Sequence, residues 1–393
     1  MSTAHQPNHL STALYIHIPF CKKKCDYCDF VSYAGKEEML EEYVQALTQE
    51  IEASPPFIPL SIFDGEGETR REGVRTIFFG GGTPTLLEPK HFDKIISTII
   101  CHLSLDIGRS EISVECNPGT ADKAKLKALH DLGINRLSIG AQSFNDRHLK
   151  TLGRIHDAKA IFRIYDDARS AGFDNINLDL MFALPSQTVE EWKADLQSAI
   201  NLKPNHLSTY NLSIEENTPF NLRLTCLPAG TATHNLQLPD EDEELEMYEY
   251  TIETLIASGY KHYEISNFAK PGFECRHNIN YWLNGNYIGV GAGAHSHING
   301  QRWSNPNCIE EYIKSMFEVR SSRFKFSPGT PDQRETIFLG LRLPEGIPTN
   351  KFNSFEKEVS DLIKDGMLEE KNGNYRLTRK GLYLGNLVFE KFV

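Results

Sequence analysis

Short runs of β-branched and aromatic residues alternate with segments of helical periodicity from residue 14 to residue 212. This alternation predicts a parallel sheet built from strand–helix units. We expect six strands, at Leu14–Ile18, Val74–Phe79, Glu111–Glu115, Arg136–Gly140, Ile176–Met181 and His206–Leu212. Six such units favour an α/β fold class in which the sheet forms a partial, open β/α barrel.

The rest of the chain extends this barrel and then changes pattern. Residues 1–300 are assigned to the barrel domain, with a glycine- and aromatic-rich extension from about residue 260, and residues 301–327 to a connecting segment. Residues 328–393 are expected to form a small winged-helix-like domain. Its pattern predicts helices at Gln333–Leu343 and Phe355–Leu368, a hairpin that turns at Asn372-Gly373, and a last helix from Thr378.

Composition narrows the classes of partner. The chain has 41 basic and 53 acidic residues, a net charge of −12, which disfavours nucleic acid as a main partner. No apolar stretch approaches the roughly 20 residues of a membrane helix, although peripheral contact with a membrane-bound acceptor is compatible with the sequence. Without an export signal, the eight cysteines indicate thiols or metal ligands, and we expect a cytoplasmic location.

Three of the cysteines are clustered directly after the first predicted strand. Cys21, Cys25 and Cys28 place three thiols within eight residues, a spacing that can direct sulfur ligands to one soft metal centre. A structural zinc site would normally have a fourth ligand nearby, and the sequence offers none at the usual spacing. His17 lies inside the strand and is expected to be structural.

The spacing C-x3-C-x2-C, with Tyr27 before the last cysteine, resembles that of the radical S-adenosylmethionine superfamily. The resemblance implies a 4Fe-4S cluster held through three irons by Cys21, Cys25 and Cys28. It also implies that S-adenosylmethionine chelates the fourth iron and that reduction cleaves its sulfonium to a deoxyadenosyl radical. The alternative is that the three cysteines form a structural zinc knot or are thiols without a metal-binding role.

Residues near the ends of the predicted strands fit the same resemblance, because ligand chemistry in β/α barrels gathers at the carboxyl ends of the strands. The segment Gly80-Gly81-Gly82-Thr83-Pro84 follows the second strand, where bare backbone allows close approach to a ligand. Taken singly, these residues could equally be turn or capping residues. By resemblance to the coproporphyrinogen-dehydrogenase-like subgroup, the S-adenosylmethionine contacts are Tyr15, Tyr27, Gly81, Gly82, Thr83, Glu115, Gln142, Arg154, Asp179 and Ser213.

Two relatives in this subgroup resemble the chain over nearly its full length. One is the oxygen-independent coproporphyrinogen III dehydrogenase, which oxidatively decarboxylates propionates to vinyl groups; the other is the HemW family of haem chaperones. The dehydrogenase pattern has a further cysteine where this chain has Phe30, and a longer arm than the 20 residues before Cys21. Both differences favour the chaperone.

The segment from His277 to Trp282 matches the HNxxYW signature of HemW proteins. A neutral imidazole is a common haem ligand and aromatic rings pack on a macrocycle, so His277, Tyr281 and Trp282 are the expected haem contacts. Cys275 is an alternative thiolate ligand. His295 and His297 are weaker candidates for the haem ligand. A structural role for His277 is the other alternative, because a lone histidine is often only hydrogen-bonded within the core.

The sequence therefore predicts a HemW-like haem chaperone that carries a 4Fe-4S cluster, S-adenosylmethionine and haem, and that delivers haem to an acceptor protein. Coproporphyrinogen III dehydrogenase is the alternative, so the sequence leaves open whether the chain is an enzyme, and it names no catalytic residue. A radical enzyme acting on RNA or protein would be a third class. It ranks last because residues 331–393 carry ten basic and ten acidic residues and thus no basic surface.

Overall fold

Six parallel strands form the centre of the main sheet, as the sequence predicts. The computed structural model describes residues 12–54, 62–63, 69–70, 74–103, 105–225, 237–318 and 332–393. The strands lie side by side in the order β10-β9-β8-β7-β6-β1. Their bounds are β1 (Thr12–Ile18), β6 (Val74–Gly81), β7 (Glu111–Cys116), β8 (Arg136–Gln142), β9 (Asn175–Phe182) and β10 (His206–Asn211).

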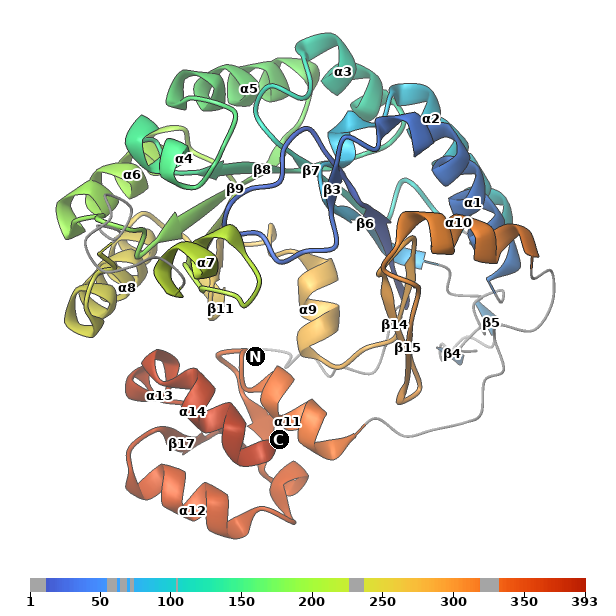
Figure 1. Cartoon of the computed structure of the whole chain (residues 1–393). Helices are drawn as coiled ribbons and strands as arrows, with labels where there is room; N and C mark the ends of the chain where they lie inside the picture. The colour runs from blue at the N-terminus through green and yellow to red at the C-terminus, as the bar shows by residue number, and fades with distance from the viewer. Residues whose placement is uncertain are drawn as a thin grey trace.

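The sheet continues beyond both edges, which the sequence did not predict. Next to β1 lies β13 (Tyr287–Val290) in parallel, followed by the antiparallel strands β14 (His295–Ile298) and β15 (Gln301–Ser304). At the other edge, β12 (Asn267–Ala269) pairs antiparallel with β10, and β11 (Lys261–Glu264) pairs with β12. The result is an open, curved sheet of eleven strands, and helix α9 (Arg276–Trp282) lies at the opening of the curve (Figure 1).

Helices cover the convex face of this sheet. Alternate residues of a strand point to opposite faces, so one set of side chains packs against the helices and the other set faces the concave side. Ile77 and Phe79 of β6 are buried on the helix side, where Phe79 meets Phe92 of α2 with ring centroids 5.1 Å apart. Phe78 and Gly80 face the concave side, which we call the lumen. The helices of this domain, apart from α9, are α1 (Leu40–Ala53), α2 (Pro89–Leu103), α3 (Lys123–Asp131), α4 (Asp146–Thr151), α5 (Ala158–Ala171), α6 (Val189–Asn201), α7 (Pro219–Thr225), α8 (Glu241–Ala257) and α10 (Ile309–Glu318).

Two segments differ in detail from what the sequence suggests. The residues 301–318 belong to the barrel rather than to a linker, because β15 extends its sheet and α10 buries Ile309 and Tyr312 in its core. The loop expected at 54–73 lies largely outside the described residues, but it contains a short pair of strands, β4 (Ile62–Phe63) and β5 (Thr69–Arg70).

The C-terminal domain has its own core and the predicted hairpin. Asn372 and Gly373 have φ values of 54° and 78°, as a tight hairpin turn requires, and they join β17 (Leu368–Lys371) to β18 (Asn374–Leu377). Its start near residue 328 lies outside the described residues. Its other elements are α11 (Gln333–Gly340), β16 (Ile347–Pro348), α12 (Glu356–Lys364), α13 (Arg379–Tyr383) and α14 (Gly385–Phe389).

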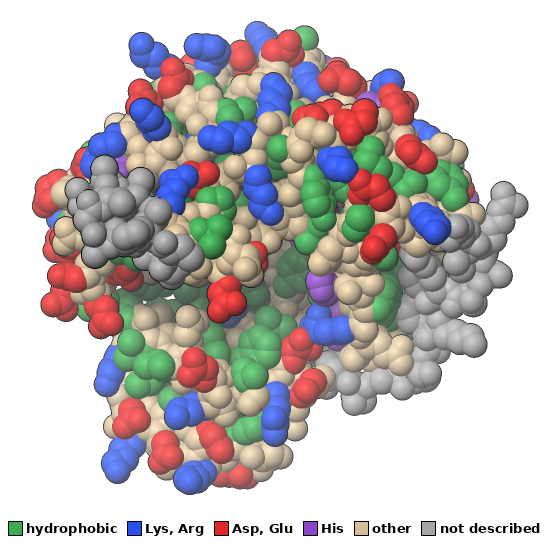
Figure 2. All heavy atoms as spheres, in the orientation of Figure 1, with side chains coloured by type: hydrophobic (Ala, Val, Ile, Leu, Met, Phe, Trp, Pro, Cys, Tyr) green, Lys and Arg blue, Asp and Glu red, His purple; other side chains and the backbone are tan. Residues whose placement is uncertain are grey.

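Figure 2 shows a hollow between the barrel and the C-terminal domain, with hydrophobic side chains at its depth and charged side chains of both signs around it. Helix α9 lies between the sheet and the C-terminal domain (Figure 1). None of the described helices is long and apolar enough to cross a membrane.

Candidate functional site

The cysteine loop is fixed to the barrel at several points. Cys21 ends the short strand β2 (Phe20–Cys21), which pairs with β3 (Tyr33–Ala34). The Asp26 backbone N–H donates to the Leu152 carbonyl at 3.1 Å, and the Phe220 N–H donates to the Asp26 carbonyl at 3.0 Å. The loop is therefore held between the α4–α5 connection and α7, with Cys21 buried and the other two cysteines half-buried.

Each cysteine sulfur has a polar neighbour. Thr83 Oγ1 lies 3.6 Å from Cys21 Sγ, and Arg154 Nη1 lies 3.4 Å from Cys25 Sγ. A nearby guanidinium favours a thiolate, whereas burial raises the pKa of Cys21 and Cys28. The described residues contain no group of three His, Cys, Asp or Glu side chains gathered around one ion. Three thiols in one short loop are the donor set that a 4Fe-4S cluster takes through three different irons.

The glycines after β6 allow this strand end to lie against the cysteine loop. Gly81 has φ +107°, and a Cβ there would lie 2.5 Å from the His17 ring. A Cβ on Gly82 would lie 2.7 Å from the Phe20 carbonyl oxygen, and the Gly82 N–H donates to the Ile18 carbonyl at 2.8 Å. Glycine is thus needed for backbone packing beside Cys21, in addition to any contact with a ligand.

Two predicted carboxylates meet in the lumen. Glu115 Oε2 accepts a hydrogen bond from the Gly81 N–H at 3.1 Å, while Asp179 accepts from Ser138 at 2.9 Å and from Asn177 at 2.8 Å. Burial, reinforced by the charge of Asp179, raises the pKa of Glu115 to about 8. Burial also raises the pKa of Asp179. Half-buried acids whose pKa is raised are typical of ligand sites, where bound groups replace water.

Arg154 connects the cysteine loop with the end of β8. Its Nη2 donates to Asn117 Oδ1 at 2.5 Å and to the Gly140 carbonyl at 2.8 Å. Gln142 is buried in the left-handed region at φ +66°, a conformation that costs a non-glycine residue about 1–3 kcal/mol. Backbone strain of this size is commonly found at functional sites.

The three remaining predicted contacts lie around this group. Tyr27 packs against a small apolar cluster that includes Leu152 and Phe220, and the charge of Arg154 acts on its hydroxyl. Tyr15 donates its hydroxyl toward His17 Nδ1 at 3.0 Å, within the lumen. Ser213 is exposed, and its hydroxyl donates to Glu215 at 2.5 Å rather than to the other predicted contacts.

The structure adds residues that the sequence analysis missed. Asn117 bridges Arg154 and Thr83, because its Nδ2 also donates to Thr83 Oγ1 at 2.9 Å. Arg136 is buried on the lumen face of β8, and its Nε has no hydrogen-bond partner among the described residues. The alternation Arg136-x-Ser138-x-Gly140 on one strand face was the available signal for Arg136.

The predicted haem ligand His277 is fully engaged in the structure. It is 1% exposed, with Thr76 Oγ1 2.9 Å from its Nδ1 and the Tyr281 hydroxyl 3.0 Å from its Nε2. Burial, followed by the charge of Arg136, lowers the pKa of His277 to about 3. The ring is therefore neutral, but neither nitrogen presents a free lone pair to iron in this conformation.

The rest of the HNxxYW segment joins the two domains. Glu111 accepts from the backbone N–H groups of Arg276 and His277 at 3.1 Å each, which caps the start of α9. Trp282 lies under the guanidinium of Arg342, 4.3 Å from the ring centroid. These contacts are those of a structural segment that closes the lumen.

The alternative ligands also differ in accessibility. Cys275 is fully buried beside Glu111, and burial raises the pKa of its thiol to about 12, which keeps it protonated. His297 is buried, with its Nδ1 3.2 Å from the Gly285 carbonyl oxygen. His295 is exposed.

Two family models match the chain. The model of the radical SAM superfamily matches residues 15–199, and the model of the HemN C-terminal domain matches residues 332–384. Together they cover the strand–helix region with its cysteine loop and the separate C-terminal domain.

Curated relatives match over almost the full length. The haem chaperone HemW of Lactococcus lactis is 36% identical, with 96% of each chain covered, and that of Bacillus subtilis is 37% identical, with 96% of this chain and 98% of the relative covered. Among solved structures, coproporphyrinogen III oxidase (HemN) from Escherichia coli has a TM-score of 0.75 at 24% identity, covering 98% of this chain and 91% of that one. At this identity the likeness shows the fold.

Proposed function

Because the chain belongs to the HemW family of haem chaperones within the radical SAM superfamily, we propose that it binds haem and delivers it to an acceptor protein. The observation that carries this proposal is the likeness to haem chaperones along the whole chain, at 36–37% identity. A cytoplasmic location is part of the proposal and rests on composition. No residue identifies the acceptor.

The proposal includes a 4Fe-4S cluster on Cys21, Cys25 and Cys28, and S-adenosylmethionine beside it. When bound, the cluster supplies one-electron chemistry to the sulfonium of S-adenosylmethionine. Arg154 Nη1 donates to Cys25 Sγ at 3.4 Å, so its guanidinium lies directly against the proposed cluster site. Glu115 and Asp179 offer carboxyl groups for the ribose hydroxyls or the charged methionine end, and the Gly81 N–H holds Glu115 in place.

The other proposed S-adenosylmethionine contacts surround these residues. Thr83 lies next to Cys21 and Tyr15 lies beside His17 and Gly80, while Tyr27 and Gln142 lie near Arg154. Ser213 would have to exchange its bond to Glu215 for one to the ligand. Two half-buried acids with raised pKa, Glu115 and Asp179, and the strained Gln142 support the location of a ligand site at this end of the barrel.

Coproporphyrinogen III dehydrogenase is the second candidate function, because the HemN fold matches over nearly the whole chain. Phe30 argues against it. The residue is 68% exposed beside the cysteine loop, where the dehydrogenase pattern has a cysteine, so this chain lacks that thiol at the mouth of the site. The first eleven residues lie outside the described part of the chain.

A test of the proposal uses full-length protein with a reconstituted cluster under anaerobic conditions. One portion receives haem and is followed by difference spectroscopy, then mixed with an apo-haem protein to measure transfer. The other portion receives S-adenosylmethionine, a low-potential reductant and coproporphyrinogen III, and its porphyrins are separated by chromatography. We expect haem binding and transfer, and no vinyl-bearing product.

Cys25→Ala is the cluster-deficient control, and we expect it to lose nearly all of the anaerobic cluster absorbance. Cys101→Ala, an exposed cysteine on α2, is the matched variant and should keep it. Formation of a divinyl porphyrin would assign the dehydrogenase function. Absence of haem binding by protein with a verified cluster would contradict the chaperone proposal.

A further inference from the structure

Asp26 lies between two of the cysteines that are proposed to hold the cluster, and it joins the cysteine loop to both of its neighbours. Its backbone N–H donates to the Leu152 carbonyl at 3.1 Å, and its own carbonyl accepts from the Phe220 N–H at 3.0 Å. Its carboxylate forms an ion pair with Arg223 of α7. Asp26 is therefore fixed to the α4–α5 connection through its backbone, and to α7 through both its backbone and its side chain.

The ion pair between Asp26 and Arg223 is partly shielded from water. The Asp26 side chain is 16% exposed and that of Arg223 is 37% exposed. The Arg223 guanidinium also lies 5.8 Å from the ring centroid of Phe220 on the same helix. Gly153 makes room for the carboxylate, because a Cβ at this position would lie 2.8 Å from Asp26 Oδ1. An Asp26 carboxylate without its partner would therefore be unfavourable, because it is largely removed from water.

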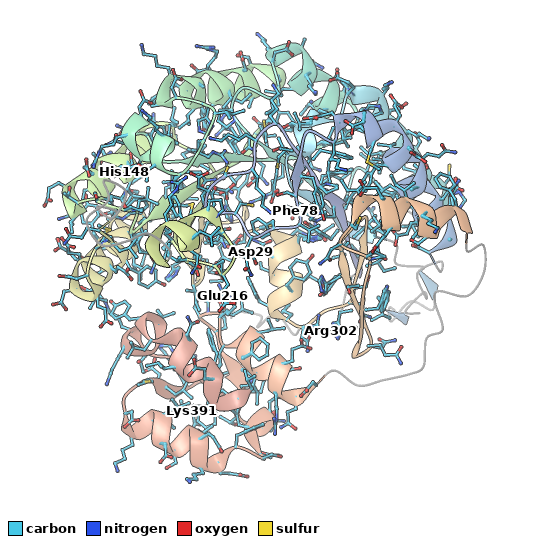
Figure 3. The ribbon with its side chains drawn as sticks, in the orientation of Figure 1. Asp29, Phe78, His148, Glu216, Arg302 and Lys391 are labelled. Carbon is cyan, nitrogen blue, oxygen red and sulfur yellow. The ribbon has the colours of Figure 1, made fainter. Side chains whose placement is uncertain are left out.

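The next residue of the loop, Tyr27, also contacts α7. Tyr27 packs against the small apolar cluster that includes Phe220. Two adjacent loop residues thus hold α7 in two different ways, Asp26 through charge and Tyr27 through apolar contact. Figure 1 shows α7 next to the cysteine loop, and Figure 3 shows Asp29 of this loop and Glu216, which precedes α7, on the same side of the barrel.

The charge of Asp26 is unfavourable beside the cysteines unless Arg223 balances it. Asp26 follows Cys25 directly and lies two residues before Cys28, and cysteines bind iron as thiolates. Like charges in a partly buried site repel one another, and an opposite charge nearby offsets this repulsion. Among the described residues, Arg223 is the only basic side chain that forms an ion pair with Asp26. Arg223 therefore makes a carboxylate acceptable at this place in the loop.

We propose that Asp26 and Arg223 are positioning residues for the cluster, because their ion pair holds the cysteine loop against α7. This contact fixes Cys25 and Cys28 relative to the barrel, so that both sulfurs are in place when the cluster forms. The inference rests on the proposed function, of which the cluster is part, and it assigns a role to two residues that are not cluster ligands. It also assigns a role to α7, which follows the connection that carries Ser213, a proposed S-adenosylmethionine contact. One short helix thereby joins the proposed ligand site to the cysteine loop.

The test uses full-length protein reconstituted with iron and sulfide, and it measures how fast the cluster absorbance is lost in air. Arg223→Met should speed this loss about fivefold, as expected for one partly exposed ion pair, whereas Arg223→Lys keeps the charge and should stay near the wild-type rate. Adding Asp26→Asn to Arg223→Met should recover part of the rate, because a neutral amide leaves no unpaired charge beside the thiolates. Arg147→Met is the matched control, since this exposed arginine of α4 pairs with Glu191 at 2.5 Å.

Two further readouts separate positioning from general instability. The cluster-free Arg223→Met protein should unfold within about 2 °C of the wild type, and the EPR spectrum of its reduced cluster should differ from that of the wild type. A wild-type rate and spectrum in Arg223→Met would overturn the inference, and so would a double variant that loses its cluster no more slowly than Arg223→Met. A wild-type protein that assembled no cluster would instead contradict the proposed function itself, so the two failures are distinguishable.

Discussion

The ion pair between Arg342 and Glu264 should control how firmly the C-terminal domain is held to the barrel. The Glu264 side chain is 0% exposed and lies 3.0 Å from Arg342 Nη2, while Arg342 is 24% exposed and stacks on Trp282. Removing one partner of a buried pair costs about 3–5 kcal/mol. Glu264 keeps donors from Ser266 at 2.8 Å and Asn267 at 2.5 Å, so we expect Arg342→Met to cost less, about 2–3 kcal/mol.

Urea titration followed by tryptophan fluorescence measures this loss. Adding Glu264→Gln to Arg342→Met should recover part of the stability, because a neutral amide leaves no unpaired charge in the interface. Arg376→Met is the control, since its partner Glu369 is 45% exposed and such pairs contribute only about 0–1 kcal/mol. A change of less than about 0.5 kcal/mol in Arg342→Met, or no recovery in the double variant, would refute the reasoning.

Two further variants test the site. Gly81→Ala should abolish most of the cluster absorbance, because the new Cβ would lie 2.5 Å from His17; Gly119→Ala, also at positive φ but with open space around it, should retain it. Glu115→Gln should remove a pH dependence: the folded-state pKa of about 8 lies above the ordinary 4.5, so the wild type loses stability as pH rises from about 4.5 to 8. Each pKa unit corresponds to about 1.4 kcal/mol, and identical stability profiles from pH 6.5 to 8 would contradict this assignment.

The central fold was predictable because its signals are local. Each of the six parallel strands is a short apolar run followed by a helical pattern, and the hairpin at Asn372-Gly373 is specified by the turn residues themselves. Helix α8 begins at a capping box formed by Asp240 and Glu243, which is another local feature.

The edges of the sheet were not predictable in the same way. The pairing of β13 with β1 joins residues more than 270 positions apart, and its register depends on contacts that no local pattern specifies. The site was partly predictable: the cysteine loop, Gly81 and Glu115 follow strand ends. Arg136 was missed because it begins a strand, where a charged residue is usually taken as a boundary.

The signature at 277–282 identifies relatives, and the structure adds where the side chains of the motif lie. A histidine ligates iron only if one ring nitrogen has a free lone pair and room in front of it. His277 satisfies neither condition here, since Thr76 and Tyr281 take both nitrogens and the ring is buried. Whether a histidine is accessible is set by its tertiary contacts, so the residue type alone could not distinguish the buried His277 from the exposed His295.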